Sequence, residues 1–215
     1  MITTGRQLNL DKLGLSNINE VHRNLSVESL IEETVKNGEG IIGPRGATIV
    51  DTGKFTGRSP KDKYIVDEPS SSDKIWWGSV NKKIDEKIFD ELYKSVIDYY
   101  NSDNSKTYLF DGFAGFDPSH NINIRIIAKR AWQAHFVNNM FIRPEKEELK
   151  DFSPDFTIIN ASSVQNKAFK QHGMNSETFI IFHLAKKIAI IGGTEYGGET
   201  VSYTHLRAHE TRSSL

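Results

Sequence analysis

Apolar residues recur at helical spacing in several stretches of the chain. The first predicted helix follows Ser26, a typical N-cap residue, and ends before Gly38, which suits the position after a helix C-terminus. A second pattern places an apolar residue every four positions and predicts an amphipathic helix over residues 84–100. The remaining predicted helices cover residues 131–140 and, with a proline and acidic residues in its first turn, residues 144–149.

Short apolar runs between these helices predict β-strands. Residues 122–128 alternate apolar side chains on one face, whereas residues 1–24 are polar and irregular, with no predicted element. Because strands and helices mix without a strict βαβ period, the predicted fold class is α/β in the mixed α+β sense, and a doubly wound sheet is disfavoured. The predicted strands are residues 41–42, 47–50, 64–66, 107–110, 122–128, 156–160, 178–184 and 187–191.

Composition narrows the class of protein. The 215 residues hold 27 Lys+Arg against 28 Asp+Glu, and the formal net charge of −1 argues against a dedicated nucleic-acid binder. The chain has no cysteine, which excludes a disulfide framework and cysteine-ligated metal sites. No apolar run is long enough for a membrane span, and the first residues lack the apolar core of a signal peptide. We therefore expect a soluble, cytoplasmic protein of one domain or two small ones, without nucleic-acid or membrane partners.

Two glycine-containing loops carry the candidate binding chemistry. Residues 56–63 (TGRSPKDK) place Arg58 beside a glycine, and a planar guanidinium there could hold a carboxylate or phosphate with two hydrogen bonds. Residues 192–199 (GGTEYGGE) end the last apolar run and offer the hydroxyl of Tyr196. From the residues alone, a solvated surface turn remains open for the first loop and a plain β-turn cluster for the second.

Other motifs favour structural roles. Residues 38–43 match G-x-G-x-x-G, but they follow a helix and open a strand, so a turn is expected rather than a dinucleotide site. The sequence contains no G-x-x-x-x-G-K-[ST] phosphate loop. Packing explains His135 and the Trp76–Trp77 pair more simply than ligand binding does. His205 and His209 have zinc-compatible spacing but no third ligand nearby.

Taken together, several segments resemble the ATP-dependent phosphoenolpyruvate carboxykinase family. They occur in the same order as in the family and span nearly all of residues 1–199. The segments are residues 51–66 (DTGKFTGRSPKDKYIV), 131–137 (AWQAHFV), 139–144 (NMFIRP), 154–156 (PDF), 175–177 (NSE) and 192–199 (GGTEYGGE). The GTP-type enzymes share the reaction, but residues 56–63 and 132–135 are similar to the ATP type.

This resemblance implies an activity and two site residues. Family members convert oxaloacetate and ATP to phosphoenolpyruvate, CO2 and ADP in gluconeogenesis, with Mg²⁺ and Mn²⁺ as metal cofactors. By position in the family motifs, Arg58 is the arginine that binds the substrate carboxylate, and Tyr196 is the tyrosine that contacts the substrate. We expect both side chains on one face of the domain, with Arg58 accessible to solvent. The family further implies a monomeric parent enzyme.

The chain also departs from the family. Members run to more than twice this length, and beyond the segment matching residues 192–199 they carry a metal-binding lysine and histidine, a P-loop, a metal-binding aspartate and a second substrate arginine. None of these is expected here. The resemblance therefore implies an incomplete amino-terminal domain, ending before the P-loop nucleotide-binding domain, with no catalytic, cofactor-binding or metal residue, inactive alone. The alternative is a non-catalytic anion- or partner-binding module derived from the same domain.

The last sixteen residues do not resemble the family. Residues 201–211 (VSYTHLRAHET) are similar to the translation of a transposase-type sequencing adapter. We therefore expect residues 1–199 to form the domain and residues 200–215 to be a non-native, disordered tail, in which His205 and His209 are not metal ligands.

Overall fold

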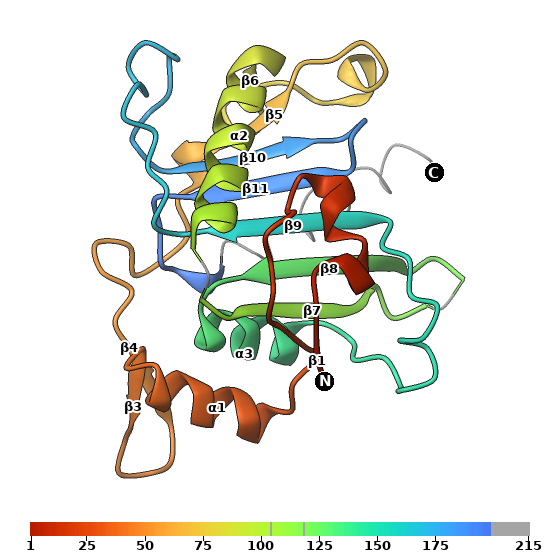
Figure 1. Cartoon of the computed structure of the whole chain (residues 1–215). Helices are drawn as coiled ribbons and strands as arrows, with labels where there is room; N and C mark the ends of the chain where they lie inside the picture. Colours follow the sequence, from red (N-terminus) through yellow and green to blue (C-terminus); the bar gives the residue numbers. More distant parts are fainter. Residues whose placement is uncertain (104, 118, 199–215) are drawn as a thin grey trace.

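The computed structural model describes residues 1–103, 105–117 and 119–198 (Figure 1). Three α-helices are found in these ranges: α1 (Val27–Lys36), α2 (Glu86–Ser102) and α3 (Ala131–Met140). Short 3-10 helices cover Arg6–Leu8, Leu10–Leu13, Pro60–Asp62 and Ser72–Lys74. The strands are β1 (Ile2–Thr3), β2 (Val21–Arg23), β3 (Gly40–Ile42), β4 (Thr48–Val50), β5 (Lys63–Val66), β6 (Lys82–Ile84), β7 (Thr107–Ala114), β8 (Ile122–Ala128), β9 (Phe156–Ala161), β10 (Phe179–His183) and β11 (Ile188–Gly192).

A mixed sheet organises the described residues. Its nine strands have the order β1-β2-β7-β8-β9-β11-β10-β5-β6, and β3 and β4 form a separate hairpin. The central pairs β8–β9 and β9–β11 are parallel, whereas β7–β8 and β10–β11 are antiparallel. Five of the eight strand pairs are parallel and three are antiparallel, and this mixed sheet confirms the predicted mixed α+β class.

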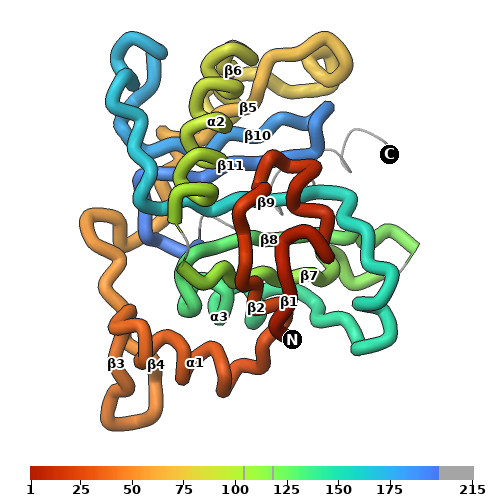
Figure 2. The backbone as a smooth tube through the Cα atoms, in the orientation of Figure 1, coloured from red at the N-terminus to blue at the C-terminus, as the bar shows by residue number. Residues whose placement is uncertain are grey.

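Each face of the sheet has its own hydrophobic core. On one face, α2 and the amino-terminal 3-10 helices pack together over the strands, with Leu10, Phe89 and Val96 almost inaccessible to water. Figure 2 shows the red amino-terminal segment beside α2 on this side of the sheet. On the other face, Val137 of α3 joins Ile126 and its neighbours in a second core. No helix in the part of the chain that the structure describes combines the length and apolar character needed to cross a membrane.

A buried cluster of charges ties the amino-terminal segment to the sheet. Asp111 in β7 is fully buried, and its carboxylate accepts hydrogen bonds from Arg23 Nε at 2.8 Å and Arg125 Nε at 2.7 Å. Arg125 Nη1 also donates to the carbonyl of Leu8 at 2.9 Å. The Asp111 carboxylate thus offsets part of the desolvation cost of burying two guanidinium groups, and the Leu8 carbonyl gives Arg125 a further hydrogen-bond partner.

Several local predictions are confirmed. The Ser26 side chain accepts a hydrogen bond from Ser29 N at the start of α1, and Gly38 follows the helix with a φ of 68°. Helix α3 and strand β8 have the predicted bounds. Residues 41–42 and 48–50 of the two predicted strands pair in the β3–β4 hairpin, and residues 43–46 connect them.

Three local predictions are wrong. Ile84 belongs to β6, and α2 begins only after Asp85, whose carboxylate accepts from Lys87 N. Residues 144–149 form no helix: residues 146–149 are turns, and Glu148 Oε2 accepts a hydrogen bond from Glu145 N at 2.7 Å. Residues 1–24 contain two strands and two 3-10 helices, because Leu8, Leu10 and similar residues between polar ones pack against α2 without a regular period.

Candidate functional site

A cavity of about 550 Å³ opens beyond one end of the central strands. Strands β9 and β11 run parallel and finish at this end of the sheet, while β5 and β10 begin there. Loops at the carboxyl ends of parallel strands commonly form binding sites, because the strands hold them rigidly and close together. The cavity is lined by residues 52–55, 176–178 and 193–195, together with Ser162, Ser163, Gln165 and Phe169.

The cavity joins two segments that are far apart in the sequence. One is the Arg58 loop, defined as residues 52–62 between β4 and β5, and the other is the Tyr196 turn, defined as residues 192–198. Lys54 supplies a positive charge to the lining, Glu177 and Glu195 supply negative charges, and the remaining polar groups are mainly hydroxyls. The cavity is therefore lined by the residues just before the predicted loop 56–63 and by part of the predicted loop 192–199, whereas residues 56–63 themselves are not in its lining.

The Arg58 loop is anchored at its carboxyl end by Asp62. This side chain is buried, with 3% of its surface exposed. Its Oδ1 accepts hydrogen bonds from Asn175 Nδ2 and Ser176 Oγ, both at 2.8 Å. Tyr64, the second residue of β5, adds a further link, since its hydroxyl accepts from Asn175 N at 2.8 Å. The exit of the loop is thus fixed to the segment that precedes β10.

The Tyr196 turn depends on glycines at its start. Gly193 has a φ of 71°, and a Cβ there would lie 2.9 Å from both the Glu177 oxygen and the Thr178 Cα. Any larger residue would meet a strained backbone and a steric clash together. The Thr178 hydroxyl donates to the Gly193 carbonyl at 2.9 Å. Glycine therefore allows the turn to approach the start of β10.

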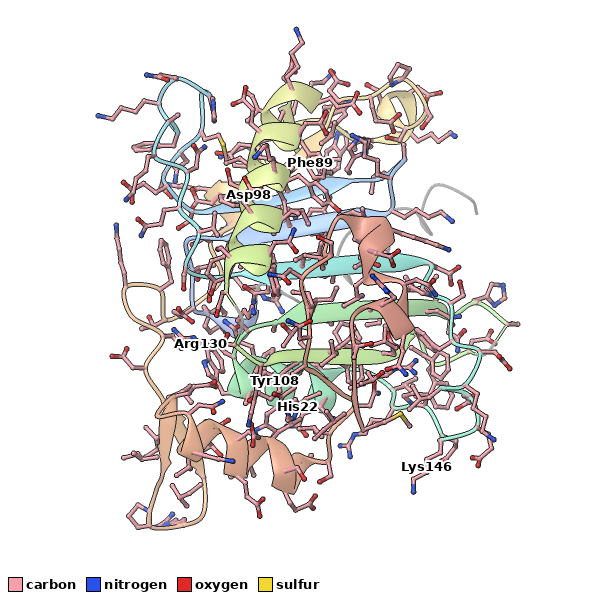
Figure 3. All side chains as sticks on the ribbon, in the orientation of Figure 1. His22, Phe89, Asp98, Tyr108, Arg130 and Lys146 are labelled. Atoms are coloured by element: carbon pink, nitrogen blue, oxygen red, sulfur yellow. The ribbon has the colours of Figure 1, made fainter. Side chains whose placement is uncertain are left out.

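Helix α3 supports the other side of the turn. Arg130 Nη2 lies 3.4 Å from Glu195 Oε1, and Gln133 Nε2 donates to the Glu195 carbonyl at 3.2 Å. A Cβ on Gly197 would lie 3.0 Å from the Trp132 ring, so this glycine permits close packing on the helix. Arg130 is labelled in Figure 3, beside the start of α3.

The two predicted site residues lie in these segments but outside the cavity lining. Arg58 is exposed, as its proposed role requires. Tyr196 is half-buried, and its backbone N–H donates to Thr194 Oγ1 at 3.1 Å. A Cβ on Gly198 would lie 2.4 Å from the Tyr196 ring and 3.0 Å from its hydroxyl, so the side chain lies over that glycine. That both side chains contact one substrate remains a prediction.

The other sequence candidates have different surroundings. Glu39, inside the G-x-G-x-x-G match, accepts a hydrogen bond from Trp132 N at 3.1 Å and so caps α3. His135 is half-buried on α3, and burial together with the charge of Arg143 lowers its pKa. Trp76 is 82% exposed, whereas the half-buried Trp77 donates from Nε1 to the Ser72 carbonyl. His205 and His209 lie outside the described residues.

Sequence reasoning gave no role to the residues that hold the two segments together. These are Asp62, Ser176, Thr178, Arg130 and Glu195. Asp62, Ser176 and Glu195 stand in segments that resemble the family, whereas Arg130 and Thr178 lie just outside them. The hydrogen bond between Ser176 and Asp62 joins positions 114 residues apart, and no local pattern indicates such a pair.

The described residues do not fit a metal centre. Across residues 1–103, 105–117 and 119–198, no group of three or more His, Cys, Asp or Glu side chains is placed to hold an ion. The cavity lining contains a single cationic side chain, Lys54, and the whole sequence has no P-loop motif for a triphosphate. Neither a metal ion nor a nucleotide is therefore assigned to these residues.

Comparison with known proteins identifies the family. Residues 19–202 match the family model described as phosphoenolpyruvate carboxykinase. The chain is 57% identical over 190 residues to the phosphoenolpyruvate carboxykinase (ATP) of Leptospira biflexa, covering 88% of this chain and 35% of that protein. The enzymes of the same name from Caldanaerobacter subterraneus and Sulfurimonas denitrificans are 48% identical over 193 residues and 46% over 190 residues.

The chain covers only part of the length of these relatives, 35% to 36% in each of the three. The matched region nevertheless includes both segments that form the cavity edge. The family match covers well over half of this chain, and the chain belongs to the phosphoenolpyruvate carboxykinase (ATP) family.

Proposed function

We propose that this chain carries the substrate-carboxylate part of a phosphoenolpyruvate carboxykinase (ATP) site. The whole enzyme would act in the cytoplasm, in gluconeogenesis, converting oxaloacetate and ATP to phosphoenolpyruvate, CO2 and ADP. In that reaction the C–C bond to the leaving carboxylate breaks, and the resulting enolate oxygen takes the γ-phosphoryl group of ATP. The observation that supports the proposal is the shared cavity, which the Arg58 loop and the Tyr196 turn line together.

Each residue has a role that follows from its chemistry. The Arg58 guanidinium would bind a substrate carboxylate through two charge-assisted hydrogen bonds, which fix orientation as well as neutralise charge. The Tyr196 hydroxyl would donate a hydrogen bond to the same substrate. Holding the substrate in one orientation favours in-line transfer to the enolate oxygen.

ATP, Mg²⁺ and Mn²⁺ would serve the parent enzyme. The described residues provide neither a metal centre nor a triphosphate cradle. Phosphoryl transfer depends on positioned positive charge around the phosphates. The 215-residue polypeptide is therefore expected to bind a substrate analogue without turning substrate over.

Calorimetric titration tests this proposal. Oxalate, a planar dicarboxylate similar to the enolate, should bind the purified chain, and phosphoenolpyruvate should bind the same site. Arg58→Ala should weaken oxalate binding roughly tenfold to a hundredfold, the size of a charge-assisted contact. Arg45→Ala, which removes another exposed arginine in the β3–β4 turn, is the matched control and should leave the affinity unchanged.

Two results would contradict the proposal. Equal oxalate affinity in the Arg58→Ala and wild-type chains would remove Arg58 from the site. A coupled assay that detected ATP-dependent formation of phosphoenolpyruvate by the purified chain would show that it carries a complete active site.

For the end of the chain, we infer that residues 201–211 are encoded by adapter sequence joined to the gene, and that residues 1–199 are an incomplete part of the native domain. Residues 200–215 lie outside the described residues, so the inference rests on the sequence. The encoding nucleotide sequence tests it: codons 201–211 should spell the adapter, and amplification of the same codons from genomic DNA would contradict the inference.

A further inference from the structure

A series of hydrogen bonds connects the Arg58 loop to the Tyr196 turn. It begins at Asp62, whose backbone N–H donates to the Ser59 carbonyl at 3.0 Å, one residue after Arg58. The Asp62 carboxylate then accepts from Ser176 Oγ at 2.8 Å. Asp62 is buried, with 3% of its surface exposed, so water competes little for this bond.

Ser176 passes the connection to β10. Its hydroxyl donates to Asp62 and accepts from Thr178 N at 3.2 Å. One hydroxyl can do both, because it carries one donor hydrogen and two acceptor lone pairs. Ser176 therefore touches both the anchor of the Arg58 loop and the residue that holds the other segment.

Thr178 completes the series. Its hydroxyl donates to the Gly193 carbonyl at 2.9 Å. Thr194, which follows Gly193, accepts a hydrogen bond through its Oγ1 from Tyr196 N at 3.1 Å. Thr178 and Thr194 are each 2% exposed. Because these groups are buried, water cannot readily replace a bond that is lost from the series, and each loss costs free energy.

We propose that Ser176, together with Asp62, is a positioning residue that sets the spacing between Arg58 and Tyr196. This inference rests on the proposed function, in which those two side chains bind one substrate. Neither Ser176 nor Asp62 needs to touch the substrate: the pair holds the Arg58 loop and the Tyr196 turn in a fixed relation. Removing the Ser176 hydroxyl would weaken the coupling between the two loops, while the bonds of Asn175 to Asp62 and Tyr64 would still hold the Arg58 loop to the segment before β10.

The first measurement needs no ligand. Amide hydrogen exchange is compared in the wild-type, Ser176→Ala and Ser176→Thr chains, with Ser95→Ala as the control. Ser95 lies on the exposed side of α2, where its hydroxyl donates to the carbonyl of Glu91 in the same helix. In Ser176→Ala the amides of both Asp62 and Tyr196 should exchange faster. Ser176→Thr keeps a hydroxyl and should restore wild-type rates, and Ser95→Ala should match wild type.

The second measurement is oxalate titration of the same four chains. Ser176→Ala should weaken binding about three- to tenfold, the size of one net hydrogen bond, with Ser176→Thr and Ser95→Ala close to wild type. Unchanged oxalate affinity in Ser176→Ala would overturn the proposal, as would faster exchange confined to Asp62 or to residues 175–178.

The two measurements separate this inference from the proposed function. If the wild-type chain does not bind oxalate, the proposed function fails, and the exchange rates at Tyr196 alone decide whether the two loops are coupled. If Ser176→Ala does not fold, Ser176→Cys replaces it, because a thiol has nearly the size of the hydroxyl but is a weak hydrogen-bond donor. Faster exchange at Tyr196 in Ser176→Cys would support the coupling, and wild-type exchange there would overturn it.

Discussion

The guanidinium of Arg130 lies 3.4 Å from the carboxylate of Glu195, which joins the start of α3 to the residue before Tyr196 (Figure 3). Both side chains are partly exposed, at 43% and 28%. The pair therefore contributes little to global stability but restrains the turn locally.

Arg130→Ala should accordingly lower the affinity for oxalate while changing the free energy of unfolding little. We expect the free energy of unfolding to fall by less than about 1 kcal/mol, because a partly exposed ion pair is screened by water. Oxalate affinity should fall measurably, since Tyr196 loses a restraint. Urea unfolding and calorimetry on one preparation check both values. Lys94→Ala removes an exposed ion pair on α2 and should change both the free energy of unfolding and the oxalate affinity less than Arg130→Ala does. Unchanged oxalate affinity in Arg130→Ala would contradict the restraining role.

Gly193→Ala should destabilise the turn because of its left-handed backbone and because of a steric clash at the new Cβ. A second glycine, Gly173, allows the two effects to be measured separately. Gly173 also has a positive φ, 65°, but a Cβ there would meet nothing within 4 Å. Gly173→Ala should therefore cost only the left-handed backbone conformation, about 1–2 kcal/mol. Gly193→Ala should cost more, since its Cβ would also clash with the backbone at Glu177 and Thr178. Equal free energies of unfolding for the two variants in urea would show that the Cβ at position 193 does not clash with the backbone at Glu177 and Thr178.

Asp111→Ala should be among the most damaging single changes. It leaves the buried Arg23 and Arg125 without their shared carboxylate, and removing one partner from a buried ion cluster typically costs about 3–5 kcal/mol. The comparison is Asp98→Ala on the exposed face of α2 (Figure 3), expected to cost less than about 1 kcal/mol. Urea unfolding gives both values. A loss below about 1 kcal/mol for Asp111→Ala would mean that the two arginines find other partners.

His135 should make the chain less stable in mild acid. Burial and the charge of Arg143 lower its pKa in the folded state below the ordinary value of 6.5. The unfolded chain then binds a proton at His135 more readily than the folded chain does. The contribution of His135 to the free energy of unfolding is therefore fully present above pH 6.5 and is lost as the pH falls from there toward the pKa of the folded state. His135→Gln should therefore lose less stability than wild type between pH 7.5 and 5.5, in urea midpoints measured at each pH. Parallel pH profiles would contradict the assignment.

The sequence predicted most of the fold because its strands are locally encoded. The alternation in residues 122–128 places Ile124 and Ile126 together in one core of the sheet, and Ser26 and Gly38 mark the ends of α1 with their usual chemistry. The amino-terminal segment could not be predicted in this way. Leu8 and Leu10 are buried by α2, which lies more than 70 residues further along the chain, so their environment is set by tertiary packing.

The candidate site was predictable in its parts but not in its connections. The chemistry of Arg58 and Tyr196 could be inferred from their loops and from family resemblance. The bond from Ser176 to Asp62 could not, because it joins residues 114 positions apart through a serine with no distinctive local pattern. Burial of Asp62 and the strand order that brings β5 beside β10 create this contact.

The central claim is that the Arg58 loop and the Tyr196 turn form one site for a substrate carboxylate. The most direct test is an oxalate titration of the isotopically labelled chain, followed by nuclear magnetic resonance of the Arg58 side chain and of backbone amides. The account predicts that Arg58 Nε–H and the amides of residues 193–197 shift together, with one dissociation constant, and that Arg58→Ala removes both responses. Shifts confined to one of the two segments, or centred away from both, would contradict it.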